Sequence, residues 1–163
     1  VCSSDLSMDI QVSSNFERLL FEMNGRDGAM TREQLTRFRD KGTMSVEADQ
    51  YDTWIAPTFR AGRASDHDTL ATIRSVHETT GMQIDPHTAV GVKAARENIR
   101  EGVPMVTMAT AHPAKFPNAV ERPTSVRPQL PEHLADLLTR PERTTTLPND
   151  LAAVQKFVAS VAR

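Results

Sequence analysis

Cysteine, glycine-rich motifs and long apolar runs are scarce in this sequence, and each absence excludes a class of protein. The 163 residues contain one cysteine, Cys2, so a single chain forms neither a disulfide framework nor a cysteine zinc site. The seven glycines match neither GxGxxG nor GxxxxGK, so no phosphate-cradling loop is present in this chain. The most apolar run, residues 103–111, is much shorter than the ~20 apolar residues of a membrane helix.

The charge is nearly balanced, which excludes a protein held mainly by a nucleic-acid backbone. Lys and Arg number 19 and Asp and Glu number 21, so the formal net charge is −2. Binding to phosphate backbones needs a basic face. We therefore expect no nucleic-acid partner and no membrane partner, and the length suits one domain or part of a larger one.

Helix-capping residues predict that most of the chain is helical. The expected helix starts are Ser14, Thr31, Ser65, Asp85 and either Asn149 or Asp150. The glycines expected to follow the helices are Gly25, Gly42, Gly81 and Gly102. Shorter helices are expected after Pro113 and from Pro131 to about Arg140.

A strand is predicted over residues 103–110, because β-branched and apolar residues there are bounded by Gly102 and by His112-Pro113. Residues 43–46 are a second, shorter candidate. Helices packed against such strands give an α/β fold with an incomplete sheet. Ligands of α/β proteins gather at the carboxyl ends of strands, so Thr110 and His112 lie at a candidate site.

Four motifs, in this order, resemble the C-terminal part of threonine synthase of the longer bacterial and fungal type. They are SMDIQVSSNFERLLFE, IDPHTAVGV, MATAHPAKFPNAVE and TLPNDLAAVQKFV. The resemblance implies that residues 7–163 are the C-terminal part of a pyridoxal-phosphate-binding catalytic domain, a helix-rich portion of the tryptophan-synthase-like fold (fold type II). Residues 1–6, VCSSDL, match the translated end of a common sequencing adapter. We expect them to be non-native, with a genuine polar tail as the alternative.

The resemblance also implies an activity and a cofactor. Threonine synthases convert O-phospho-L-homoserine and water to L-threonine and phosphate, and we expect this to take place in the cytoplasm. Pyridoxal 5′-phosphate is the electron sink, held as a Schiff base by a lysine. In the family that lysine and the phosphate loop lie upstream of the matched region. The chain is therefore expected to be inactive without the N-terminal part of its own protein, whether that protein is a monomer or a dimer.

Five residues are assigned to the site by this resemblance. Thr110 is expected to bind the pyridine nitrogen of the cofactor, with Thr107 as second choice. Ser14 and Asn15 are expected to bind the substrate phosphate at a helix start, and Arg18 adds positive charge there. The alternative for Thr110 is that it merely ends a strand, and helix capping explains Ser14 equally well.

Two residues and two other functions complete the expectations. Asp85 and His87 are expected to be mainly structural and to shape the loop near the cofactor. One other function is a different lyase of the same fold, such as a serine or threonine dehydratase. The second is a stand-alone remnant that binds a partner without catalysis.

Overall fold

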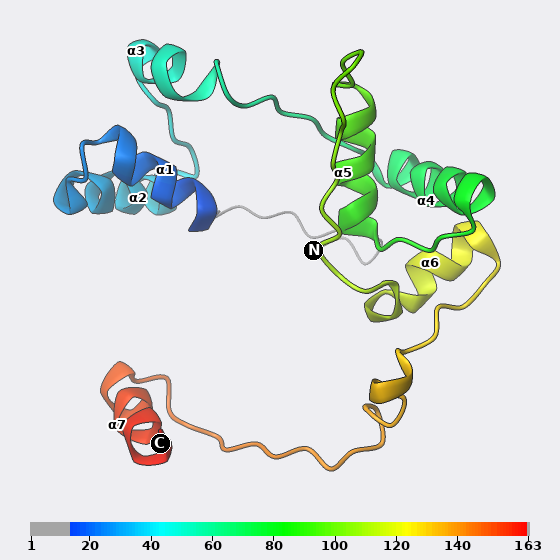
Figure 1. The fold of residues 1–163 in the computed structure, drawn as a ribbon. Coiled ribbons are helices and arrows are strands. Elements are labelled where there is room, and N and C mark those ends of the chain that lie inside the picture. Colours follow the sequence, from blue (N-terminus) through cyan, green and yellow to red (C-terminus); the bar gives the residue numbers. More distant parts are fainter. Residues whose placement is uncertain (1–13, 163) are drawn as a thin grey trace. The chain divides into compact units, whose positions relative to one another are not determined.

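The computed structural model describes residues 14–162, and its regular structure is helical (Figure 1). Within this range β structure is limited to an isolated antiparallel bridge between Arg100 and Val103. The chain divides after residue 129 into two compact units, which we describe separately. None of the described helices is long and apolar enough to cross a membrane. Residues 1–6, interpreted as non-native, lie outside the described residues.

Among residues 14–162, eight helical segments lie in the first unit and two in the second. In the first unit they are α1 (Ser14–Met23), α2 (Gly28–Lys41), α3 (Ala48–Gln50), the π-helix η1 (Tyr51–Ile55), α4 (Asp66–Thr80), α5 (Pro86–Arg96), the 3₁₀-helix η2 (Pro113–Lys115) and α6 (Pro117–Thr124). In the second unit they are the 3₁₀-helix η3 (Glu132–Leu134) and α7 (Leu151–Val161).

Helices α4, α5 and α6 share the main buried core of the first unit. Ile73 from α4, Ala89 from α5 and Val120 from α6 are each 0% exposed. Ile84, in the loop between α4 and α5, closes the same cluster. Helix α4 packs on both α5 and α6, and buried Ala89 joins α5 to this core.

Helices α1 and α2 pack on each other around buried Leu20 and Leu35. The start of α2 differs from the sequence prediction, because the helix is capped by Asp27 rather than by Thr31. One carboxylate oxygen of Asp27 accepts the N–H groups of Ala29 and Met30, at 2.8 and 3.0 Å. Thr31 lies inside the helix instead.

Three other predicted helix starts are confirmed. Ser65 and Asp68 form a reciprocal capping box at the start of α4, and the helix ends at left-handed Gly81. Asp85 caps α5, which ends at Arg96 and is shorter than expected. Asp150 caps α7 by accepting the N–H of Ala153 at 2.8 Å.

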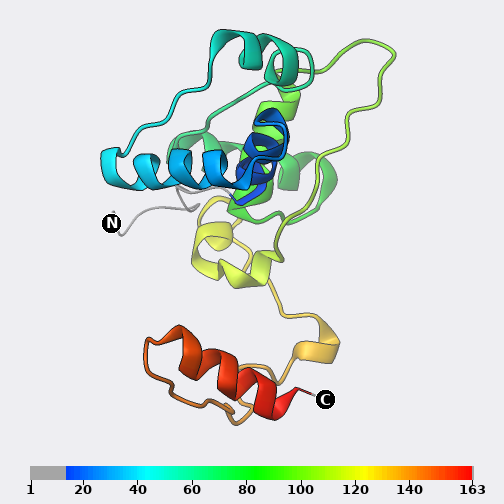
Figure 2. The ribbon, with the colours of Figure 1, turned by 90° about the vertical axis from the view of Figure 1, so that its left-hand side faces the viewer.

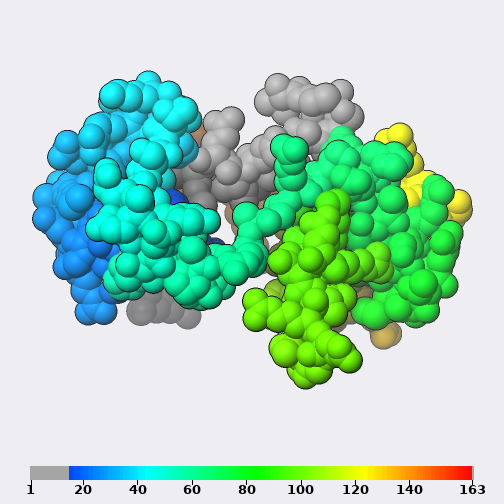
Figure 3. All heavy atoms as spheres, turned by 90° about the horizontal axis from the view of Figure 1, so that it is seen from above, coloured from blue at the N-terminus to red at the C-terminus, as the bar shows by residue number. Residues whose placement is uncertain are grey.

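The predicted strands are wrong for the described residues. Residues 43–46 and 104–110 are coil (Figures 1 and 2). A strand is stabilised by hydrogen bonds to a neighbouring strand, and the described part of the chain supplies none. The segment that was expected to be a strand exposes Val106 to 75% and Met108 to 73%. Figure 3 shows the chain just beyond α5, in yellow-green, at the surface.

The second unit has little tertiary packing of its own. Helix α7 buries no residue, although four apolar side chains lie along it at helical spacing. These are Leu151, Val154, Val158 and Val161. The helix predicted from Pro131 to Arg140 is reduced to the single turn η3.

Candidate functional site

A buried carboxylate at the start of α5 organises the candidate site. Asp85 is 1% exposed and caps the helix. Its Oδ1 accepts the backbone N–H groups of His87 and Thr88, at 2.9 and 3.3 Å. Its Oδ2 accepts the side-chain hydroxyl of Thr88. Both oxygens of the carboxylate are therefore paired, as a buried charge requires.

The hydroxyl of Thr88 connects this carboxylate to a segment far along the chain. The backbone N–H of Thr110 donates to Thr88 Oγ1 at 3.3 Å, across 22 positions of sequence. The Thr88 hydroxyl donates its hydrogen bond to Asp85, so a lone pair of the hydroxyl oxygen can accept from the Thr110 N–H. The predicted cofactor residue Thr110 is thus tethered to α5 through its main chain.

The second predicted cofactor residue meets the same face of α5 one turn further on. A Cβ placed on Gly91 would lie 3.2 Å from Thr107 Cγ2, so only glycine leaves comfortable room for this methyl group. Positions three apart in a helix lie on one face, so Thr88 and Gly91 form a continuous surface. The segment 107–110 runs along this surface in the opposite direction to α5 (Figure 1).

The side chain of Thr110 is free, although its backbone is tethered. Thr110 is exposed and Thr107 is half-buried. The Thr110 hydroxyl makes no hydrogen bond to any residue that the structure describes, so it can bind a ligand. The sequence analysis missed Thr88, whose role depends on a contact 22 residues away. The available signal was a threonine three positions after a capping aspartate.

His112, also predicted to lie at this site, serves local structure. Its Nδ1 accepts the N–H of Ala114 at 3.2 Å and so caps η2. The ring of His87 packs on Phe116, with centroids 5.0 Å apart and planes tilted by 46°. His87 Nδ1 is buried with no hydrogen-bond partner in the described part of the chain.

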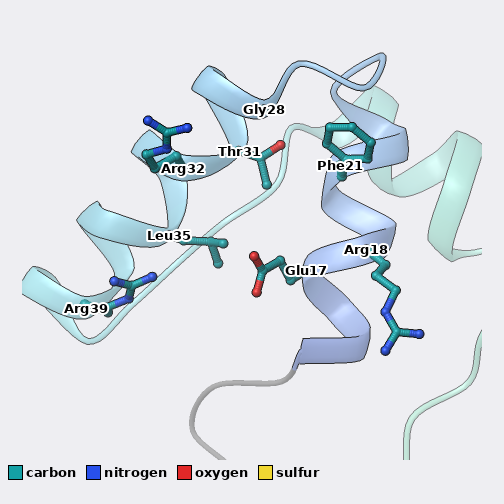
Figure 4. Close-up of a pocket in the computed structure, with 8 residues that line it drawn as sticks. All are labelled: Glu17, Arg18, Phe21, Gly28, Thr31, Arg32, Leu35 and Arg39. Atoms are coloured by element: carbon teal, nitrogen blue, oxygen red, sulfur yellow. The ribbon is translucent and has the colours of Figure 1, made fainter. Parts of the chain in front are cut away.

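The predicted phosphate-binding residues lie on α1, which precedes α5 by more than 60 residues in the sequence. Asn15 and Arg18 are exposed, and the side chain of Ser14 is outside what the structure describes. Arg18 lines a pocket of about 570 Å³ between α1 and α2, together with Arg32 and Arg39 (Figure 4). The three guanidinium groups do not converge in this view, and it is Glu17 that points between the helices.

One lysine near the site is occupied by an ion pair. Lys93 on α5 bonds to Glu97 Oε1 at 2.5 Å. This hydrogen bond raises the pKa of Lys93, which keeps the amine protonated and unsuited to act as a nucleophile. Among residues 14–162 no group of histidine, cysteine and carboxylate side chains has the arrangement of a metal site.

Comparison with known proteins identifies the family. The family model "Threonine synthase, C-terminal" matches residues 88–158, a range that begins at Thr88 and includes Thr107 and Thr110. Threonine synthase of Pseudomonas aeruginosa is 54% identical over 155 residues, which are 94% of this chain and 33% of that protein. The chain belongs to the threonine synthase family. The resemblance read from the four motifs is confirmed.

Two further comparisons agree with this family. Threonine synthase of Corynebacterium glutamicum is 35% identical over 159 residues, 96% of this chain and 33% of that protein. The crystal structure of a pyridoxal-phosphate-bound threonine synthase from Brucella melitensis aligns with a TM-score of 0.77 and 45% identity. It covers 100% of this chain, which in turn covers 35% of that structure. The chain spans about a third of the length of the relatives that it matches.

Proposed function

We propose that this chain is the C-terminal part of a threonine synthase that converts O-phospho-L-homoserine and water to L-threonine and phosphate. The observation that carries the proposal is the 54% identity to the Pseudomonas aeruginosa threonine synthase over 94% of the chain. Residues 7–163 then belong to a catalytic domain of the tryptophan-synthase-like fold (fold type II). The cytoplasm is the proposed location, since it follows from this role in amino-acid synthesis.

We propose pyridoxal 5′-phosphate as the cofactor of the whole protein, and Thr110 as a residue that binds it. When bound, this cofactor supplies an electron sink that stabilises a neighbouring carbanion. A pyridine nitrogen accepts a hydrogen bond from a neutral hydroxyl, and Thr110 offers one on a tethered backbone. Thr107, packed against Gly91, is the second candidate.

The lysine that holds the cofactor lies, in this proposal, outside the chain. Lys93 is engaged by Glu97, and Lys115 Nζ lies 6.0 Å from the centre of the Phe116 ring. The isolated chain is therefore expected to be inactive and to retain no covalently bound cofactor. Retention that is lost in Lys115→Ala would contradict this.

We also propose that Ser14, Asn15 and Arg18 bind the phosphate group of the substrate. Helix α1 begins at Ser14 in the described range, and the positive end of the helix dipole favours an anion. Arg18→Ala should then raise KM for O-phospho-L-homoserine and change kcat less. Arg37→Ala, on α2 beside Glu33, is the matched control and should leave both constants unchanged.

The activity is tested on the full-length protein that contains this chain. Phosphate release and L-threonine formation from O-phospho-L-homoserine are measured for the wild type, Thr110→Val and Thr110→Ser. We expect both products from the wild type, a loss in Thr110→Val and retention in Thr110→Ser, which keeps the hydroxyl. Turnover of unphosphorylated L-threonine would instead support a dehydratase. Inactivity towards both substrates would favour a non-catalytic binding module.

A further inference from the structure

We propose that Thr88, oriented by Asp85, is a positioning residue that fixes the backbone of Thr110 so that its hydroxyl faces the cofactor. The inference rests on the proposed function of Thr110 and adds two residues to it. Neither Asp85 nor Thr88 touches the cofactor in this proposal. They act through the Thr110 N–H.

Thr88 differs from the other buried threonines of the chain in the use of its hydroxyl. Thr31, Thr69 and Thr72 each donate to the backbone carbonyl four residues earlier, at 2.8 to 2.9 Å. This is the ordinary way for a helical threonine to satisfy its hydroxyl. Thr88 instead donates to the Asp85 carboxylate and accepts from a distant backbone amide. The first bond is local to the helix start, but the second joins residues 22 positions apart and is not part of the helix.

Asp85 likewise differs from the other capping aspartates. Asp27 and Asp150 lie at exposed helix starts, and each uses one carboxylate oxygen, which accepts two backbone N–H groups at Asp27 and one at Asp150. Asp85 is 1% exposed and uses its second oxygen for the hydroxyl of Thr88. A carboxylate can only accept, so it compels Thr88 to donate toward it. The remaining lone pair of Thr88 is thereby directed to Thr110.

A second point of contact makes this tether directional. Thr107 packs against Gly91, and Thr110 is bonded to Thr88, one turn earlier on the same face of α5. Two anchor points three residues apart define both the position and the direction of the segment between them. One anchor alone would leave the segment free to rotate about it. Loss of the Thr88 bond should therefore displace Thr110 while Thr107 stays in place.

The test uses the full-length protein and four variants at positions 72, 85 and 88, and the second readout adds Thr110→Val. Thr88→Val removes the hydroxyl and keeps the shape, and Thr88→Ser keeps the hydroxyl. Thr72→Val is the matched control, since Thr72 is also a buried helical threonine but bonds only within α4. Asp85→Asn retains a good helix cap while presenting an amide donor to Thr88, so it tests the same link if Thr88→Val fails to fold.

The first readout is hydrogen exchange of the Thr110 amide in the cofactor-free protein. Loss of one neutral hydrogen bond corresponds to up to about tenfold faster exchange in Thr88→Val. Asp85→Asn should give a smaller acceleration. Thr88→Ser and Thr72→Val should match the wild type. Wild-type exchange at Thr110 in both Thr88→Val and Asp85→Asn would overturn the tether.

The second readout is the affinity for pyridoxal 5′-phosphate, followed by the absorbance of the bound cofactor. We expect weaker binding in Thr88→Val, with recovery in Thr88→Ser, and a larger loss in Thr110→Val. If Thr110→Val binds normally, the proposed role of Thr110 fails while the tether stands. If Thr110→Val loses affinity but Thr88→Val does not, Thr110 binds the cofactor and the positioning role of Thr88 is overturned.

Discussion

Helices α5 and α7 have the same length and the same kind of cap, yet they differ in what they bury. Each has 11 residues and an aspartate N-cap, which accepts two backbone N–H groups in α5 and one in α7. Helix α5 buries Pro86, Thr88 and Ala89, whereas α7 buries none of its residues. A good cap therefore makes a helix in both places, and only packing partners turn a helix into part of a core.

The difference matters for function because the candidate site lies on the packed helix. Ala89 of α5 is buried in the core that α4 and α6 share, with α5 packed on α4, whereas α7 leaves its apolar side exposed. Thr107 and Thr110 depend on α5 for their position. Hydrogen-bonded positioning of this kind needs a rigid support.

The largest expected loss of stability comes from a substitution in the core that contains Ala89 of α5. Ile73 on α4 is 0% exposed and touches the cluster that contains Ala89. Ile73→Ala should lower the free energy of unfolding of the first unit by about 2–5 kcal/mol, since it leaves a cavity. Val158→Ala on exposed α7 should change it by less than about 0.5 kcal/mol. Urea denaturation of the 163-residue chain measures both, and equal losses would refute the contrast.

The next largest loss of stability is expected from removing the cap of α5, compared with removing the cap of α7. Asp85→Ala removes a buried cap and leaves the Thr88 hydroxyl without its acceptor, so about 2 kcal/mol of stability should be lost. Asp150→Ala removes an exposed cap, whose N–H groups can turn to water, and should cost about 0.5 kcal/mol. Helix content by circular dichroism and urea midpoints separate the two. A larger loss for Asp150→Ala would show that burial does not set the difference.

The helix caps and the Thr110 contact show which features can be predicted from the sequence and which cannot. The caps at Ser65, Asp85 and Asp150 were predictable because their hydrogen bonds extend over at most three residues. The strand predicted at residues 103–110 was wrong because pairing depends on neighbours far along or outside the chain. The family resemblance, together with the place of Thr110 at the end of the predicted strand, suggested it as a site residue. Its tether to Thr88 could not be predicted, because the contact joins residues 22 positions apart.

A smaller effect is expected from Gly91 on the Thr107 side of α5. Gly91→Ala should gain helix propensity, worth about 1 kcal/mol in an unhindered helix. The new Cβ would lie 3.2 Å from Thr107 Cγ2, so we expect the net gain to be clearly smaller. Exposed α7 supplies the calibration, through the stability difference between Gln155→Gly and Gln155→Ala. A gain at Gly91 equal to that difference would mean that Thr107 does not pack closely on α5.

The smallest expected effect is a pH dependence at the start of α4, the helix against which α5 packs. The Ser65 backbone N–H and then the Ser65 hydroxyl bond to Asp68, and these bonds lower the pKa of the Asp68 carboxyl. A carboxyl whose folded pKa lies below its unfolded value stabilises the fold above the unfolded pKa. That contribution is lost as the pH falls through the lowered pKa. Because Asp68 is well solvated, screening keeps the effect small.

An NMR titration of the Asp68 side-chain carbon measures this shift, and Ser65→Ala tests its cause. The variant removes the hydroxyl that donates to the Asp68 carboxylate and accepts the Asp68 backbone N–H, and it keeps the Ser65 backbone N–H. The pKa of Asp68 should therefore rise part of the way towards its ordinary value and remain below it. The backbone N–H of Ser65 is still present and is the larger cause of the shift. A complete return to the ordinary pKa would mean that the hydroxyl dominates. The start of α4 would then depend on a side chain rather than on the backbone geometry of its cap.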